Sequence, residues 1–201
     1  LKQGADILDL GGYSCRPGAA DVTVAEELDR VIPAVKAIIQ AFPDAVISVD
    51  TFRAEVAEAS IEAGASIIND ISGGNLDEAM LETVARLQVP YILMHMRGTP
   101  QTMNSLTDYN DLVLEVIDEL QAKVAQLKNL GVNDIILDPG FGFAKTVDQN
   151  FELMRRLEEL RVLELPLLVG VSRKSMTYKY LGINQSEAPA GTILLNTIAV
   201  T

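Results

Sequence analysis

Three polar side chains stand at or near the ends of short apolar runs, where they could bind a ligand. Asp50 closes "AVISVD" (45–50), Asn69 lies in "SIIND" (66–70), and Asp138 closes "DIILD" (134–138). A carboxylate only accepts hydrogen bonds, so it suits a ligand edge that presents several N–H donors, whereas an amide both donates and accepts. The alternative is that each residue caps the next helix or shapes a turn, and for one such residue alone that alternative is preferred.

Two loops add cations and hydroxyl groups that suit an anionic ligand. "YSCRPG" (13–18) follows one apolar run, and "GVSRKS" (170–175) overlaps the end of another. Arginine binds carboxylate or phosphate in a bidentate manner, whereas lysine acts as a compact charge. The backbone N–H groups around Gly11 and Gly12 could help the first loop to hold an anion. The candidate residues are Ser14, Cys15, Arg16 and Pro17 in the first loop, and Ser172, Arg173, Lys174 and Ser175 in the second.

Lys174 and Cys15 each have a nucleophilic alternative. Lysines that form Schiff bases usually lie within a strand, whereas Lys174 follows one, so we prefer a donor role toward a ring oxygen or nitrogen. Cys15 is the only cysteine of the chain and has no base beside it in the sequence. A nucleophilic role for Cys15 is therefore the less favoured interpretation.

Two further motifs bear on the site. "DPGFGFAKT" (138–146) predicts a loop whose glycines allow close approach to a ligand and whose Phe143 could stack on a flat heterocycle, although it matches no nucleotide-binding fingerprint. His95, the only histidine, is interpreted as a buried, hydrogen-bonded structural residue, with general base as the alternative. With no other His or Cys nearby, a zinc site at His95 is disfavoured.

The elements that must position these residues alternate along the chain. Six apolar runs, rich in Ile, Val and Leu, are separated by segments with helical spacing, which predicts βα units and a parallel sheet. Asn75 and Asp108 are predicted helix N-caps, and Gly64 and Gly131 are predicted helix stops. The runs span residues 5–10, 45–50, 66–70, 90–95, 134–138 and 166–170.

A doubly wound sheet and a (β/α)₈ barrel of the TIM type both satisfy this alternation. Nearly every run ends in a polar residue or a glycine, and only a barrel brings all its strand ends into one ring, so we favour the barrel. Six of eight βα units are expected within the chain, as one domain over residues 1–201. The chain opens at Leu1 and stops within the apolar stretch "GTILLNTIAVT", so we expect it to be a piece of a longer polypeptide, truncated at both ends.

Composition excludes several classes of protein. The net charge of −12 argues against a nucleic-acid partner, because phosphate binding needs a basic face. No apolar run approaches the ~20 residues that cross a bilayer, so no membrane association is expected. A single cysteine fits a reducing compartment, and a cytoplasmic location follows as an expectation.

In their order, six motifs make the chain resemble the dihydropteroate synthases, the sulfonamide targets of folate synthesis. They are "GADILDLGGYSCRPGA", "SVDTFR", "IINDISGG", "LMHMRGTPQTM", "ILDPGFGFAKT" and "GVSRKS". The resemblance implies a (β/α)₈ barrel, usually a homodimer, that condenses 6-hydroxymethyl-7,8-dihydropterin diphosphate with 4-aminobenzoate.

The resemblance also assigns roles to residues of this chain. It implies a pterin site made of Asp50, Asn69, Asp138 and Lys174, in a pocket lined by Ile71, Met94, Phe143 and Gly170. It implies that the candidate residues of the two cationic loops hold the diphosphate and the aminobenzoate. Asp50, Arg16 and Lys174 are the implied catalytic residues: the diphosphate leaves with the help of Mg²⁺ and Arg16, and Asp50 stabilises the resulting pterin methylene cation.

Two family features are absent from the sequence: an asparagine of the first strand that assists Mg²⁺, and an Arg-x-His motif of the final strand. No metal ligand is therefore expected among these residues, and the 201 residues alone are expected to be inactive.

Three alternatives stay open. They are a methyltetrahydrofolate-dependent corrinoid methyltransferase, which resembles these strand ends but lacks the two cationic loops, a Schiff-base aldolase acting through Lys174, and a truncated pterin-binding domain without catalysis.

Overall fold

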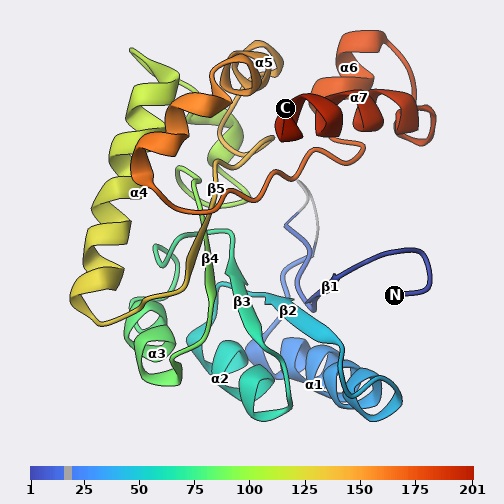
Figure 1. Ribbon diagram of the computed structural model, residues 1–201, viewed down its shortest axis with the longest axis vertical. Helices are drawn as coiled ribbons and strands as arrows, with labels where there is room; N and C mark the ends of the chain where they lie inside the picture. The colour runs from blue at the N-terminus through green and yellow to red at the C-terminus, as the bar shows by residue number, and fades with distance from the viewer. Residues whose placement is uncertain (16–19) are drawn as a thin grey trace.

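The structure is a computed structural model that describes residues 1–15 and 20–201, and in it strands and helices alternate (Figure 1). The strands are β1 (Ile7–Gly11), β2 (Val46–Asp50), β3 (Ile67–Asp70), β4 (Tyr91–Met94) and β5 (Ile135–Asp138). The α-helices are α1 (Val24–Ala41), α2 (Ala54–Glu62), α3 (Met80–Leu87), α4 (Leu112–Asn129), α5 (Val147–Arg155), α6 (Ser175–Leu181) and α7 (Pro189–Val200). Short 3₁₀ segments are η1 (Met103–Ser105), η2 (Leu157–Leu163) and η3 (Gln185–Glu187).

Every strand pairing in the sheet is parallel, and the strands pair in chain order from β1 to β5. In Figure 1 the strands lie at the centre, and helices α1 to α4 follow one another along one side of them. A helix connects each strand to its neighbour, as in the repeating unit of a (β/α)₈ barrel. The α/β class is confirmed, and in the described residues the strands form an arc in which β1 and β5 do not pair.

The sixth predicted strand, residues 166–170, is not a strand in the structure. It makes one isolated parallel bridge, between Leu137 and Leu167. Leu137 N donates to the Pro166 carbonyl at 2.8 Å, and Leu168 N donates to the Leu137 carbonyl at 2.7 Å. The segment thus starts a pairing alongside β5 and leaves it after one bridge, so it still delivers Gly170 and the loop that follows to the same end of the sheet.

Apolar and polar side chains alternate along the strands, so that one face of the sheet packs against the helices and the other face is polar. On β2, Ile47 and Val49 are fully buried in the hydrophobic core with Val31 and Val35 of α1. Because successive side chains of a strand point to opposite faces, Ser48 and Asp50 face away from that helix layer. The apolar face therefore fixes the direction in which the polar strand-end residues point.

Two of the four predicted helix ends were wrong. Gly64 and Gly131 follow the ends of α2 and α4, as predicted. Asn75 does not cap α3, which begins five residues later, and the N-cap of α4 is Asp111, whose side chain accepts from Leu114 N at 3.1 Å. Asp108 instead offers its backbone carbonyl to Arg97 Nη1 at 2.8 Å, and this contact holds the chain in a loop before α4.

Within the ranges that the structure describes, no helix combines the length and the apolar character needed to cross a bilayer.

Two glycines with similar backbone angles provide a test of the loop after β5. Gly140 (φ +73°) and Gly131 (φ +86°) both adopt the left-handed conformation, but a Cβ on Gly140 would lie 2.0 Å from the carbonyl oxygen of His95, whereas one on Gly131 would contact nothing within 4 Å. We expect Gly140→Ala to lower the free energy of unfolding by about 3 kcal/mol or more, because backbone strain and a backbone clash combine. Gly131→Ala should lower the free energy of unfolding by only about 1 kcal/mol, because backbone strain acts there without a clash. Urea denaturation of the two variants measures both values, and equal losses would contradict the described loop geometry.

Candidate functional site

Strand register brings the predicted polar residues together at one end of the sheet. Asp50 of β2 lies beside Asn69 of β3, and Met94 of β4 lies beside Asp138 of β5. Asn69 Nδ2 also donates to Asp9 Oδ2, on β1, at 3.2 Å. The alternative that these residues serve as helix caps does not hold for Asp50, because α2 has Arg53 at its N-cap and no side-chain cap.

Electrostatics at Asp50 are unfavourable to its charged form. Burial, followed by the negative charges of Asp9, Asp70 and Glu27, raises the pKa of Asp50 to about 7. Asp70 is fully buried and bonds to Ser72, Gly74 N and the hydroxyl of Tyr91, so it shapes a turn and does not face a ligand. Of these neighbouring carboxylates, Asp50 is the one that lines the open cleft described below.

Asp138 and Lys174 form the second half of the polar site. Burial raises the pKa of Asp138, and the charges of Lys174 and Lys145 with a hydrogen bond from Gly140 N (2.7 Å) oppose that rise. Burial lowers the pKa of Lys174, opposed by Asp138. A Cβ on Gly170 would lie 3.7 Å from Lys174 Nζ and 3.9 Å from Asp138 Oδ2, so Gly170 leaves room for both side chains.

Lys174 also contacts the glycine-rich loop. Its Nζ donates to the Phe141 carbonyl and lies 4.8 Å from the centre of the Phe143 ring. The two sequence motifs "DPGFGF" and "GVSRKS" are thus in direct contact, although Phe141 and Lys174 are 33 positions apart. This contact places an aromatic ring, a carboxylate and an ammonium group around one space.

A cleft of about 940 Å³ opens at this end of the sheet. Many of the predicted site residues line it, namely Ser14, Cys15, Asp50, Phe143, Ser172, Arg173, Lys174 and Ser175. Ile71 and Met94 instead belong to a small apolar cluster with Met96, Met103 and Ala144, and both Phe143 and Cys15 pack against that cluster. Arg16 and Pro17 lie outside the described residues.

Cys15 is not activated for nucleophilic attack. Burial first, and then the charges of Asp50, Glu27 and Asp70, raise the pKa of the Cys15 thiol to about 12. A thiol with this pKa stays protonated near neutral pH, so it lacks the thiolate that a nucleophile needs. This agrees with the prediction from the sequence, in which a nucleophilic Cys15 was the less favoured interpretation.

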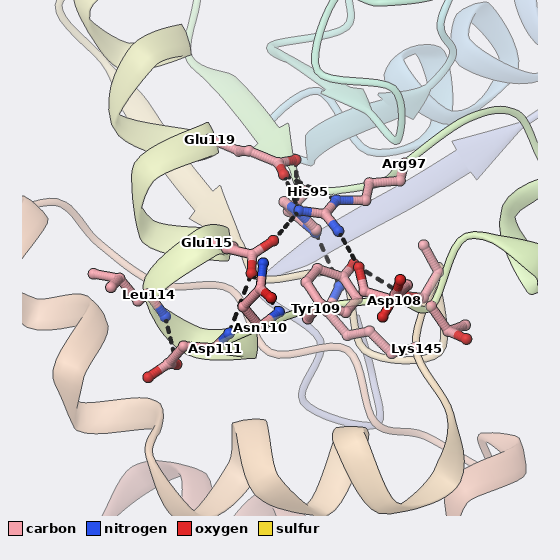
Figure 2. Close-up of polar contacts among 12 residues, drawn as sticks. His95, Arg97, Asp108, Tyr109, Asn110, Asp111, Leu114, Glu115, Glu119 and Lys145 are labelled. Atoms are coloured by element: carbon pink, nitrogen blue, oxygen red, sulfur yellow. Dashed lines mark hydrogen bonds and ion pairs between the residues drawn. The ribbon is translucent and has the colours of Figure 1, made fainter.

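His95 is buried and hydrogen-bonded, as predicted. Its Nε2 lies 3.0 Å from Glu119 Oε2, and its Nδ1 lies 3.0 Å from the Nζ of Lys145 (Figure 2). Burial and the charge of Lys145 lower the pKa of His95 to about 4. His95 is therefore neutral near pH 7 and serves as a link between two charged side chains.

Sequence reasoning missed Lys145 and the Glu27–Arg53 pair. Lys145 lies within "DPGFGFAKT", but only Asp138, the glycines and Phe143 of that motif were given roles. Glu27 is fully buried, accepts from Thr51 Oγ1 and Arg53 Nη1 at 2.7 Å each, and joins α1 to the end of β2. The guanidinium of Arg53 also lies over the rings of Tyr13 and Phe52, 5.3 and 5.2 Å from their centres. A charged residue on the apolar face of α1 was the available signal for Glu27.

The described side chains do not suggest a metal site. Across residues 1–15 and 20–201, no group of three or more His, Cys, Asp or Glu side chains is placed to hold an ion.

Fold and site define an α/β barrel-type protein with a cleft at the carboxyl ends of its parallel strands. The sequence model of the family described as pterin binding enzyme matches residues 1–201, and the chain belongs to that family. It is 51% identical over 183 residues to the dihydropteroate synthase of Synechocystis sp., covering 90% of this chain and 63% of the length of that protein.

Two solved structures agree with this assignment. A Yersinia pestis dihydropteroate synthase in complex with a sulfonamide drug superposes with a TM-score of 0.95 at 42% identity, covering 99% of this chain and 72% of that one. A Xanthomonas albilineans dihydropteroate synthase with 4-aminobenzoic acid superposes with a TM-score of 0.91 at 37% identity, covering 98% and 71%. The predicted resemblance is confirmed.

The raised pKa of Asp50 predicts that this residue destabilises the fold at neutral and alkaline pH. Its folded pKa, about 7, exceeds the unfolded value of about 4, so the cost is complete above pH 7 and vanishes as the pH falls toward 4. We expect Asp50→Asn to raise the free energy of unfolding by about 2–4 kcal/mol at pH 8 and to leave it unchanged near pH 4.

Urea denaturation across this pH range measures the difference, with Asp44→Asn as the control because Asp44 is exposed two residues before β2. A stability of Asp50→Asn that follows the wild type at every pH would show that Asp50 is not electrostatically strained.

Proposed function

We propose that the protein carrying this chain is a dihydropteroate synthase. It condenses 6-hydroxymethyl-7,8-dihydropterin diphosphate with 4-aminobenzoate and releases 7,8-dihydropteroate and diphosphate. The observation that carries this proposal is the convergence of Asp50, Asn69 and Asp138 with Lys174 at one end of the sheet. The names of the relatives support it, and the family membership of the chain makes a pterin the expected ligand.

The pterin site follows from the chemistry of these groups. A pterin presents an amino-pyrimidinone edge rich in N–H donors, which suits the acceptor oxygens of Asp138 and the mixed amide of Asn69. Lys174 donates to a ring nitrogen or oxygen, and Phe143 covers a ring face. Ile71, Met94 and Gly170 complete the apolar wall of the subsite.

The reaction requires no protein nucleophile. The C–O bond between the pterin methylene and the diphosphate breaks, the diphosphate leaves with the bonding electrons, and the arylamine nitrogen attacks the methylene cation and then loses a proton. Asp50 in its ionised form stabilises that cation electrostatically, in a site where burial strengthens the interaction. A developing positive charge beside Asp50 also relieves the repulsion that raises the pKa of this residue.

The second substrate and the leaving group occupy the two cationic loops. Ser14, Cys15, Arg16 and Pro17 contact the diphosphate and position the aminobenzoate, and Arg16 is the cation that assists departure. Ser172, Arg173 and Ser175 receive the aminobenzoate carboxylate. Described residues of both loops line the same cleft, which supports a shared site.

Further properties are part of the same proposal. Residues 1–201 form one pterin-binding domain of a homodimeric cytoplasmic enzyme. Mg²⁺ is the ion that the resemblance implies for the diphosphate, but no step above passes through it, because the described side chains do not form a metal site.

The proposal is tested on the full-length protein with two assays run together. Calorimetry with 6-hydroxymethylpterin measures binding, and formation of dihydropteroate measures turnover. Turnover with pterin binding supports the synthase. Pterin binding without turnover indicates a non-catalytic pterin domain, and loss of both removes the proposal.

Asp50→Asn separates binding from catalysis. We expect kcat to fall by about 10²–10³-fold, because the cation loses its electrostatic partner, while the dissociation constant for 6-hydroxymethylpterin changes by less than about fivefold. Steady-state kinetics and calorimetry supply the two values, with Asp44→Asn as the matched control. Equal losses in kcat and in pterin affinity would exclude the cation-stabilising role of Asp50.

A further inference from the structure

Lys145 is a buried lysine whose hydrogen-bonding capacity is fully used inside the protein. It lies in the loop between β5 and α5, and its side chain is almost completely buried. Its Nζ lies 3.0 Å from His95 Nδ1, 3.2 Å from the Gly140 carbonyl oxygen and 3.1 Å from the Phe143 carbonyl oxygen. An ammonium group has three N–H donors, and the three acceptors here match that number.

The contact with Lys145 fixes the tautomer of His95. Burial lowers the pKa of Lys145 to about 7, so below that pH the side chain is an ammonium group. An ammonium group can only donate, so Nδ1 of His95 must then accept and Nε2 must carry the hydrogen. That hydrogen is donated to Glu119 Oε2, at 3.0 Å. Although burial opposes ionisation of Glu119, hydrogen bonds from His95 and Arg97 lower its pKa to about 2. Lys145 thus donates to His95, and His95 donates to the carboxylate of Glu119, so both hydrogen bonds run in the same direction.

The same network reaches the loop from a second direction (Figure 2). Arg97 Nε donates to Glu119 Oε1 at 2.9 Å, and Arg97 Nη2 donates to Glu115 Oε2 at 2.7 Å. The guanidinium of Arg97 lies 3.9 Å from the centre of the Tyr109 ring, and the Tyr109 hydroxyl donates to the Ala144 carbonyl at 3.0 Å. Helix α4 is therefore connected to both Ala144 and Lys145.

These contacts bear on the pterin site through the backbone of the loop. The carbonyls that Lys145 holds belong to Gly140 and Phe143. Gly140 donates its N–H to the carboxylate of Asp138, and Phe143 presents its ring near Lys174. Asn150 supports the other side of the loop, where its Oδ1 accepts from Gly142 N at 2.6 Å. Lys145 thus restrains Phe143, whose ring covers the face of the ligand, and Gly140, which donates to the Asp138 carboxylate that recognises the edge of the ligand.

We propose that Lys145 is a positioning residue for pterin recognition, which holds the loop of residues 140–145 through the carbonyls of Gly140 and Phe143. The inference rests on the proposed function, because it names the pterin as the ligand of this site. In this role Lys145 acts through Asp138 and Phe143 and does not contact the reacting atoms.

The charges around Lys145 give the role a pH signature. The groups that bear on it are Asp138, Lys174, Glu119 and Arg97, with neutral His95 in direct contact. Burial lowers the pKa of Lys145, and the Asp138 carboxylate is the first charge that opposes this. In return, the charge of Lys145 opposes the rise in the pKa of Asp138. Removal of this charge moves the ionisation of Asp138 to higher pH.

The experiment compares Lys145→Met with wild type in the full-length protein, with calorimetry of 6-hydroxymethylpterin from pH 5 to 8. We expect Lys145→Met to weaken pterin binding about tenfold at pH 7, and the pH at which affinity falls by half on acidification to rise by about one unit. Lys128→Met, at an exposed lysine in the last turn of α4, is the matched control and should follow wild type. If Lys145 only stabilised the fold, its substitution would not change the pH at which pterin affinity falls by half on acidification (the acid limb).

Two results would overturn the positioning role. One is a folded Lys145→Met protein with wild-type pterin affinity and an unmoved acid limb. The other needs no folded variant at position 145: ¹⁵N NMR of the wild type, with His95→Gln to assign the signal, should show the neutral Nε2–H tautomer at pH 6, where Lys145 is protonated and His95 is neutral. An Nδ1–H tautomer or an imidazolium would exclude donation from Lys145. Wild-type protein that binds pterin but forms no dihydropteroate would overturn the proposed reaction instead, so the two failures are distinguishable.

Discussion

The parallel register of β2 with β3 and of β4 with β5 is the constraint from which the site follows. Each strand packs one face against the helices through fully buried side chains such as Ile47, Val49 and Leu137. Because successive side chains of a strand point to opposite faces, this packing places Asp50, Asn69 and Asp138 on the face of the sheet away from the helices. A slip of one residue in either pairing would place a carboxylate in the helix layer, so the hydrophobic core that stabilises the fold also aligns the polar groups.

The same arrangement concentrates negative charge in a poorly solvated place. The pKa of Asp50 is raised to about 7. Of the other carboxylates nearby, the buried Asp70 accepts four hydrogen bonds and the buried Glu27 accepts two. Asp138 has cations nearby in Lys174 and Lys145. An unrelieved carboxylate at Asp50 is what a site would need in order to favour a cationic transition state. In the proposed reaction, the lower stability caused by ionised Asp50 is offset when a positive charge develops beside it.

The sequence predicted the strand ends and the two motif loops because those features are local. Apolar runs that end in Asp or Asn, and loops rich in Gly, Arg and Lys, are visible without any knowledge of distant contacts. Lys145 with His95, and Glu27 with Arg53, were missed because each pair joins residues more than twenty positions apart. Asp108 failed as a helix cap because Arg97, eleven positions earlier, binds its backbone carbonyl in the loop before α4. The run 166–170 has a strand's composition, and only tertiary packing decides that it pairs at a single residue.

The measurement that tests the account most directly is the affinity of the full-length protein for 6-hydroxymethylpterin relative to 6-hydroxymethyllumazine. The lumazine has a carbonyl where the pterin has its 2-amino group, so it offers an acceptor to the Asp138 carboxylate in place of a donor. A site built from strand-end acceptors should prefer the pterin by about 100-fold or more, and this preference should collapse in Asp138→Asn because an amide can donate to the carbonyl. Equal affinity for the two compounds in the wild type would contradict a site built from acceptors at the strand ends.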